Sequence, residues 1–243
     1  YTPEKLPQRP NGTPHDALAD DPNAGTWGRF AWEYYRGYHG HISAIDDELG
    51  RVMAKLDALG IADDTILVYT SDHGSMMGSH GLGGKRQPYD ESIRVPFLIR
   101  WPGRIEPGTA VDALFGTIDI HPTLCDLAGI GAPATCEGVS YAPWFTGGAG
   151  PDPEAQLIMH IAKENASGGN NHPAPLFRGV RTKTHTYAVK DGVPWILFDN
   201  AADPYQRTNR IDAPESAATR ERLHGAMIAL LKEAGEMDPA YLA

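Results

Sequence analysis

The sequence has little positive charge for its length. Its 243 residues include 21 lysines and arginines against 31 aspartates and glutamates, which gives a formal net charge of −10. A protein that binds a phosphate backbone needs Lys and Arg in excess, so this balance argues against nucleic acid as a partner. The sequence also lacks an apolar run long enough to cross a bilayer, which argues against a membrane span. We expect an acidic soluble protein that binds small anions only where a local positive charge attracts them.

Cysteine is scarce, and the common catalytic motifs are missing. Cys125 and Cys136 do not make a disulfide framework; they could pair, but free thiols are the expected state. There is no G-x-S-x-G elbow, no P-loop and no G-x-G-x-x-G in a βαβ unit, so these motifs support no hypothesis here. The chain opens at Tyr1 without an initiator Met or an apolar leader. We therefore expect its beginning to lie elsewhere.

The first half of the chain has the pattern of an α/β domain. Residues 1–26 are rich in Pro, Asn, Asp and Gly, which predicts a surface loop. From Trp27, apolar residues recur every three or four positions up to Leu59, which predicts a long helix with Gly60 as its C-terminal stop. Two nearly all-apolar runs, 65–70 and 95–101, predict strands of the kind buried on both faces of a parallel sheet. A further helix is expected over 118–129.

The second half has a different pattern. A Gly- and Pro-rich linker covers roughly 131–153. Short strands with turn signals between them follow, which predicts an antiparallel sheet, and the segment 215–235 predicts an amphipathic helix. We therefore expect two units, an α/β portion over 1–147 and a small α+β subdomain over 148–243.

A carboxylate and an imidazole stand side by side where the first strand should end, in the stretch Ser71-Asp72-His73-Gly74. Ligands in open α/β sheets bind just past the carboxyl ends of strands. Asp72 and His73 converge there only if the backbone bends, and we expect Gly74 to allow that bend. The pair would supply half of a metal site, although Ser-Asp before Gly is also ordinary turn chemistry.

Lys85 lies in the glycine-rich loop between the two strands. It is either a solvated surface lysine or a point charge delivered to an anion near the metal. His80, in the same loop, could orient a ligand or donate to an oxyanion; a packed or exposed loop histidine is the simpler interpretation. His172 falls in a loop of the second unit and could overhang a substrate, although the sequence alone does not promote it.

Four separate blocks, in order and with matching spacing, resemble the later half of a sulfatase. They are "YYRGYHGHISAIDDELGRVMAKLDALGIADDTILVYTSDHG", "GSHGLGGKRQPYDESIRVPFLIRWPG", "DIHPTLCDLAGI" and "RGVRTKTHTYAV…LFDNAADPYQRTN". Together they cover roughly residues 27–210. The resemblance is to the type I, formylglycine-dependent sulfatases of the alkaline-phosphatase-like superfamily. It implies a mixed α/β sheet flanked by helices, here incomplete, followed by the smaller C-terminal subdomain.

The resemblance also implies roles for the candidate residues. Asp72 and His73 match the second pair of metal ligands of this family, and Lys85 matches the lysine that contacts the sulfate and stabilises the departing oxygen. A divalent cation is implied, with Ca²⁺ as the usual ion and Mn²⁺ or Mg²⁺ as alternatives because of the histidine ligand. The implied substrates are sulfated small molecules or sulfated carbohydrates. Many family members are exported, which leaves a periplasmic or extracellular location open; the oligomeric state stays undefined.

The sequence departs from the family pattern in its nucleophile. Neither Cys125 nor Cys136 lies in a C-x-P-x-R motif, and no serine version is present. The family's earlier Asp-Asp metal pair also has no counterpart. We therefore expect a fragment whose partner is the missing N-terminal half of the same protein, which would carry the formylglycine. Alone, the fragment should be inactive and should expose an apolar sheet face and edge. Two alternatives are a phosphonate monoester hydrolase or phosphodiesterase of the same superfamily and a non-catalytic remnant.

Overall fold

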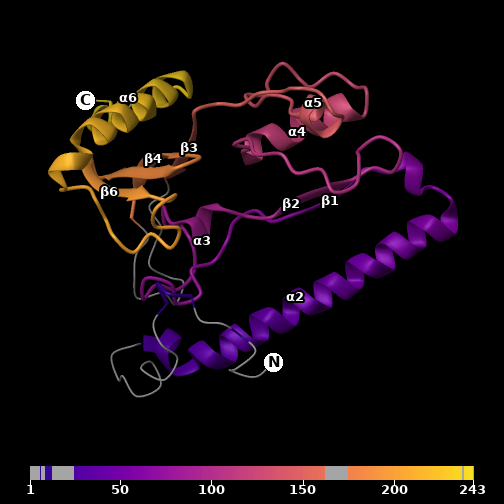
Figure 1. The fold of residues 1–243 in the computed structure, drawn as a ribbon, viewed down its shortest axis with the longest axis horizontal. Coiled ribbons are helices and arrows are strands. Elements are labelled where there is room, and N and C mark those ends of the chain that lie inside the picture. The colour runs from indigo at the N-terminus through magenta and orange to yellow at the C-terminus, as the bar shows by residue number, and fades with distance from the viewer. Residues whose placement is uncertain (1–5, 7–8, 13–24, 162–174, 237, 243) are drawn as a thin grey trace.

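The computed structural model describes the chain except residues 1–5, 7–8, 13–24, 162–174, 237 and 243, and it describes only the backbone of 25–34. Most of the predicted loop 1–26 therefore lies outside the described residues, and so does His172. Within the described part, the order of the main elements is a long helix, a two-stranded sheet, two short helices, a four-stranded sheet and a last helix (Figure 1). No helix in this part of the chain is long and apolar enough to span a bilayer.

The long helix α2 runs over Gly25–Leu59, as its apolar periodicity predicts. Gly60 ends it with a φ of +67°, a left-handed conformation that favours glycine. Figure 1 shows α2 extending along one side of the molecule, apart from both sheets. Much of its apolar stripe is exposed as a result, at Tyr38, Ile42, Ile45, Val52 and Leu59.

The first sheet differs from the prediction in the direction of its strands. Strand β1 (Leu67–Thr70) pairs antiparallel with β2 (Phe97–Arg100), in the register Leu67↔Arg100 to Thr70↔Phe97. Both runs were expected as strands of a parallel sheet, and the antiparallel direction in which they pair with each other was not predicted. An all-apolar run indicates that both faces of a strand are suited to burial, but it carries no information on the direction of its neighbour. In the described chain the strands are mostly half-buried, and Leu98 is 61% exposed.

Two short helices follow the hairpin. Helix α4 covers Thr117–Leu127, and helix α5 covers Ala142–Phe145 within the predicted linker. Asp119 stabilises the start of α4, because its carboxylate accepts a hydrogen bond from the backbone N–H of Gly116 at 2.9 Å. The buried Pro122 lies inside α4.

The second sheet has the antiparallel order β3-β4-β5-β6, as the sequence predicts. Its strands are Ala155–His160, Phe177–Thr182, His185–Lys190 and Val193–Asp199. Helix α6 (Ala217–Glu233) packs on one face through Leu223, Met227 and Leu231, none of which is exposed. The other face is formed by Phe177, Ala188, Ile196 and Phe198.

That second face supports the loop between β1 and β2. Tyr89 packs against it, with its ring centroid 5.7 Å from that of Phe198. The short helix α3 (Asp90–Ile93) follows immediately. The four-stranded sheet is therefore joined through its own core to the loop that carries Lys85.

Candidate functional site

The site begins where β1 ends. Thr70 is the last residue of the strand, and Asp72 and His73 follow in an irregular segment. The Asp72 side chain is 82% exposed, while that of His73 is 37% exposed. The His73 Nε2 atom lies 3.3 Å from Asp72 Oδ2, so both side chains do converge past the strand end, as the sequence predicts.

His73 is held in one tautomer. Its Nδ1 lies 2.8 Å from the carbonyl oxygen of Gly74, which can only accept, so Nδ1 carries the proton and donates it. The Nε2 lone pair is therefore directed to the same side as the Asp72 carboxylate. An imidazole whose other N–H donates to a backbone carbonyl is the usual arrangement of a histidine metal ligand.

Lys85 meets this pair directly. Its Nζ atom donates to His73 Nε2 at 2.5 Å. The ammonium group therefore lies next to the imidazole atom that would hold a cation, and it brings the positive charge that an acidic protein needs to attract an anion. Of the candidates that the sequence singled out, Asp72, His73 and Lys85 come together in the structure.

The electrostatics around Asp72 favour its charged form. Desolvation raises the pKa of its carboxyl, but His73, the hydrogen bonds from backbone N–H groups and Lys85 act in the opposite direction. The net result is a pKa below the ordinary value. A carboxylate and an imidazole are donors that Mn²⁺, Mg²⁺ and Ca²⁺ accept to different degrees.

These residues fit half of a cation site. One carboxylate and one imidazole are too few ligands for any of these ions, which take six or more. Within the described residues no group of three or more His, Cys, Asp and Glu side chains is placed to hold a metal. Any further carboxylate, imidazole or thiolate ligands would have to come from outside the described residues.

Gly74 has a different role from the expected one. Its φ is not in the left-handed region, so the bend does not depend on glycine's conformational freedom. A Cβ at this position would lie 2.0 Å from the carbonyl oxygen of Glu91. The Gly74 N–H donates to the Ser92 carbonyl at 2.9 Å. Glycine is required because the segment after Asp72-His73 packs directly against the backbone of Glu91 and Ser92.

His80 lies in a separate cluster. Its ring stacks on Tyr89 at 4.1 Å between centroids, and its Nε2 lies 3.1 Å from Asn11 Nδ2. The same Asn11 amide donates to the Glu91 carboxylate at 2.7 Å. Burial lowers the pKa of His80, and Glu91 partly offsets this shift. These contacts match the simpler interpretation of a packed histidine, and a catalytic role for it stays a prediction.

A large open hollow adjoins the candidate site. It has a volume of about 1520 Å³ and is bordered by Asp72, His73 and Lys85, by the β1–β2 hairpin and by β3. Its lining combines the apolar hairpin with charged side chains. A hollow of this size exceeds a drug-sized pocket and has room for a sugar chain or for a further segment of protein.

Comparison with known proteins identifies the family. A family model of sulfatases matches residues 3–130, and a model described as N-sulphoglucosamine sulphohydrolase, C-terminal, matches residues 78–233. The first match covers more than half of the chain, and the two overlap across the loop that carries Lys85. The chain belongs to the sulfatase family, within the alkaline-phosphatase-like superfamily.

Individual relatives agree with this assignment. An ulvan-active sulfatase from Formosa agariphila is 37% identical over 242 residues, covering 97% of this chain and 44% of the relative. A solved structure in complex with its substrate D-glucosamine-2-N,6-O-disulfate has a TM-score of 0.77 at 27% identity, covering 88% of this chain and 43% of the other. A phosphonate monoester hydrolase from Silicibacter pomeroyi has a TM-score of 0.76 at 26% identity, covering 99% and 52%. The chain thus spans about half the length of the proteins it resembles.

Three residues that support the site were not predicted from the sequence. Asp90, Arg181 and Gln206 join the Lys85 loop to the four-stranded sheet, and none was singled out from the sequence. One signal was available. Arg181 stands in a strand whose other residues are buried, and a charged residue in such a strand requires a partner.

Proposed function

We propose that the chain is part of a hydrolase that cleaves sulfate esters of carbohydrates. The observation that carries the proposal is the convergence of Asp72, His73 and Lys85 past the end of β1, in a chain of the sulfatase family. The substrate class rests on the relatives, of which one acts on ulvan and another binds a glucosamine disulfate.

Each of the three residues has a distinct task in this proposal. Asp72 and His73 hold a divalent cation, with Ca²⁺ as the first choice and Mn²⁺ or Mg²⁺ as alternatives. When bound, this cation neutralises charge on the sulfate group and on the attacking nucleophile. Lys85 binds a sulfate oxygen and stabilises the negative charge that develops on the departing ester oxygen. The Nδ1–H of His73 stays on the Gly74 carbonyl, so Nε2 keeps its lone pair. That lone pair accepts from Lys85 in this structure, and it would bind the cation once Lys85 turns to the sulfate.

The nucleophile comes from outside these 243 residues. We infer a formylglycine for this role from the family resemblance, because neither Cys125 nor Cys136 lies in the C-x-P-x-R motif of the family. Their surroundings also suit other roles: Cys125 is buried in α4, and Cys136 Sγ lies 3.3 Å from His121 Nδ1. In this proposal the 243-residue chain does not hydrolyse sulfate esters by itself.

The test uses the full-length protein and two alanine variants. Asp72→Ala should abolish tight Ca²⁺ binding in calorimetry together with most turnover of a sulfated sugar. Lys85→Ala should lower kcat by about 100- to 1000-fold, the usual cost of one oxyanion-stabilising group, and should leave Ca²⁺ affinity nearly unchanged. If Asp72→Ala keeps both cation binding and activity, the assignment of the site is wrong.

A matched control separates Lys85 from lysines in general. Lys232 lies exposed in the last turn of α6 and does not border the hollow. Because an exposed surface charge contributes little, Lys232→Ala should change kcat by no more than about twofold. Equal losses in Lys85→Ala and Lys232→Ala would contradict a specific role for Lys85.

A second candidate function is phosphonate monoester hydrolysis. The likeness to the Silicibacter pomeroyi phosphonate monoester hydrolase favours it, because that alignment covers 99% of this chain. Rates on a sulfate ester and a phosphonate monoester with the same aryl leaving group decide between the two. A higher kcat/KM for the phosphonate monoester would contradict the proposed sulfatase function and support phosphonate monoester hydrolysis instead.

A further inference from the structure

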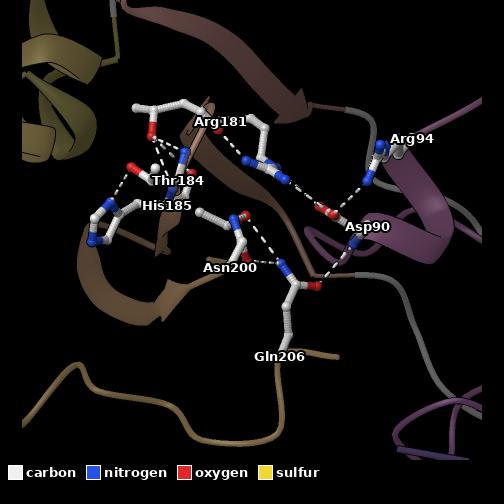
Figure 2. Close-up of polar contacts among 9 residues, drawn as sticks. Asp90, Arg94, Arg181, Thr184, His185, Asn200 and Gln206 are labelled. Carbon is white, nitrogen blue, oxygen red and sulfur yellow. Dashed lines mark hydrogen bonds and ion pairs between the residues drawn. The ribbon is translucent and has the colours of Figure 1, made fainter. Parts of the chain in front are cut away.

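The loop that carries Lys85 is fastened to the four-stranded sheet by a polar network that reaches across the chain (Figure 2). Arg181 Nε lies 2.9 Å from Asp90 Oδ1, and Arg181 Nη2 lies 3.1 Å from Asp90 Oδ2. This two-point contact between a planar guanidinium and a carboxylate fixes orientation as well as distance. The side chains of Arg181 and Asp90 are only 17% and 11% exposed, so water competes weakly for the pair.

A second contact fixes the backbone at the same place. The Oε1 atom of Gln206 accepts a hydrogen bond from the Asp90 N–H at 2.9 Å. The Gln206 side chain is fixed in turn, because its Nε2 donates to Thr186 Oγ1 at 3.0 Å and to Asn200 Oδ1 at 2.9 Å. Gln206 is 1% exposed. Asp90 is therefore held by its side chain to β4 and by its backbone to the segment after β6.

From Asp90 the contacts continue to the candidate site. Asp90 begins helix α3, which includes Ser92. The Ser92 hydroxyl accepts from the Gln87 N–H at 3.2 Å, two residues from Lys85. The Ser92 carbonyl accepts from the Gly74 N–H at 2.9 Å, next to His73. One serine thus touches both segments whose side chains meet at the site.

We infer that Arg181 is a positioning residue for this site: through Asp90 and Ser92 it sets the place of Lys85 relative to His73. The inference rests on the proposed function, because it assigns the C-terminal sheet a part in the reaction of the same site. Arg181 does not have to touch the substrate for this role. A displacement of about 1 Å at a group that acts on the transition state costs on the order of 100-fold in rate.

The test compares three variants of the full-length protein. Arg181→Gln removes the guanidinium, and Asp90→Asn removes the charge of its partner with little change of size. Arg94→Gln is the matched control, because Arg94 also approaches Asp90, at 3.9 Å, but is 78% exposed. We expect kcat to fall about 10- to 100-fold in the first two variants and to change by no more than about twofold in Arg94→Gln. The double variant should lose no more kcat than the more impaired of the two single variants, because both substitutions break the same contact.

The leaving-group dependence distinguishes positioning from loss of stability. If Lys85 stabilises the departing oxygen, its displacement should slow phenyl sulfate, with the poorer leaving group, more than 4-nitrophenyl sulfate. The ratio of the two kcat/KM values should therefore shift in Arg181→Gln in the same direction as in Lys85→Ala. A variant that merely unfolds part of the protein lowers both rates equally. An unchanged ratio in Arg181→Gln would overturn the inference.

Amide hydrogen exchange separates this inference from the proposed function. In Arg181→Gln, peptides that span residues 82–92 should exchange faster than in the wild type, while those of α6 should not change. The control Arg94→Gln should leave both regions unchanged. If the wild-type protein hydrolyses no sulfate ester, the proposed function fails, and the exchange result then decides alone. Unchanged exchange over 82–92 would show that Arg181 does not hold the loop.

Discussion

Replacing Gly74 with alanine should lower the free energy of unfolding by about 2–4 kcal/mol. The added Cβ would lie 2.0 Å from the Glu91 carbonyl oxygen and 2.9 Å from its carbon, whereas ordinary contacts begin at 3.4 Å. Because the obstacle is backbone rather than the end of a flexible side chain, the two segments must separate. Overpacking of this kind costs about 1–3 kcal/mol. The hydrogen bond from Gly74 to Ser92, 2.9 Å long, would be lost as well, at about 1 kcal/mol.

The assay is chemical denaturation of the full-length protein, with Gly225→Ala as the matched control. Gly225 lies in α6, and no neighbouring group lies within 4 Å of the place that an alanine Cβ would occupy, so the added methyl group meets only open space. Alanine in a helix is favoured over glycine by about 0.5–1 kcal/mol, so this control should be stabilised. The two substitutions add the same methyl group and should shift the unfolding midpoint in opposite directions.

The same substitution should also weaken the candidate site, because Gly74 follows His73 and provides the carbonyl that fixes its tautomer. We expect Gly74→Ala to lower Ca²⁺ affinity under conditions in which the protein is still folded. A Gly74→Ala protein as stable as the wild type would refute the close approach of residue 74 to Glu91. An unfolding midpoint that moves in the same direction as that of Gly225→Ala would do so too.

Two further predictions concern pH and the isolated chain. Burial lowers the pKa of His80 in the folded state from 6.5, against an opposing effect of Glu91, so the unfolded state takes up a proton first as the pH falls. The contribution of neutral His80 to the free energy of unfolding should therefore be fully present above pH 6.5 and be lost as the pH falls toward the folded pKa. His80→Asn, which does not titrate and tolerates the φ of +56° at this position, should flatten that part of the pH curve measured by denaturation. The isolated 243-residue chain, with the apolar stripe of α2 exposed, should self-associate in size-exclusion chromatography, and a sharp cooperative melt of a monodisperse monomer would contradict this.

Local patterns in the sequence predicted much of the secondary structure. The periodicity from Trp27 and the stop at Gly60 correspond to α2, and the turn-separated runs correspond to β3–β6. These features can be predicted because the spacing of apolar side chains within one helix or strand indicates which of its faces is buried. The direction of β2 relative to β1 was not readable, because it depends on a chain reversal through the long Lys85 loop.

The candidate site was predicted only in part, because local patterns indicate neighbouring residues but not contacts between distant ones. Asp72 and His73 are neighbours in the sequence, and the strand end beside them has a local signal. Arg181 lies 91 residues from Asp90, and Gln206 lies 116 residues from it, so no local pattern indicates their contacts. The segment "LFDNAADPYQRTN" gives no local sign that Gln206 lies at the centre of a buried network.

The distance along the chain between Asp90 and Gln206 has a consequence for the order of events during synthesis. The ribosome must add 116 residues after Asp90 before Gln206 exists to accept its N–H. At roughly 5–20 residues per second, this takes on the order of 6–23 seconds. Until Arg181 and then Gln206 are added, the nascent chain has Lys85 but not the full set of side chains that fasten its loop. A message truncated before the Arg181 codon would encode the lysine, the carboxylate and the imidazole of the site without the arginine that holds Asp90.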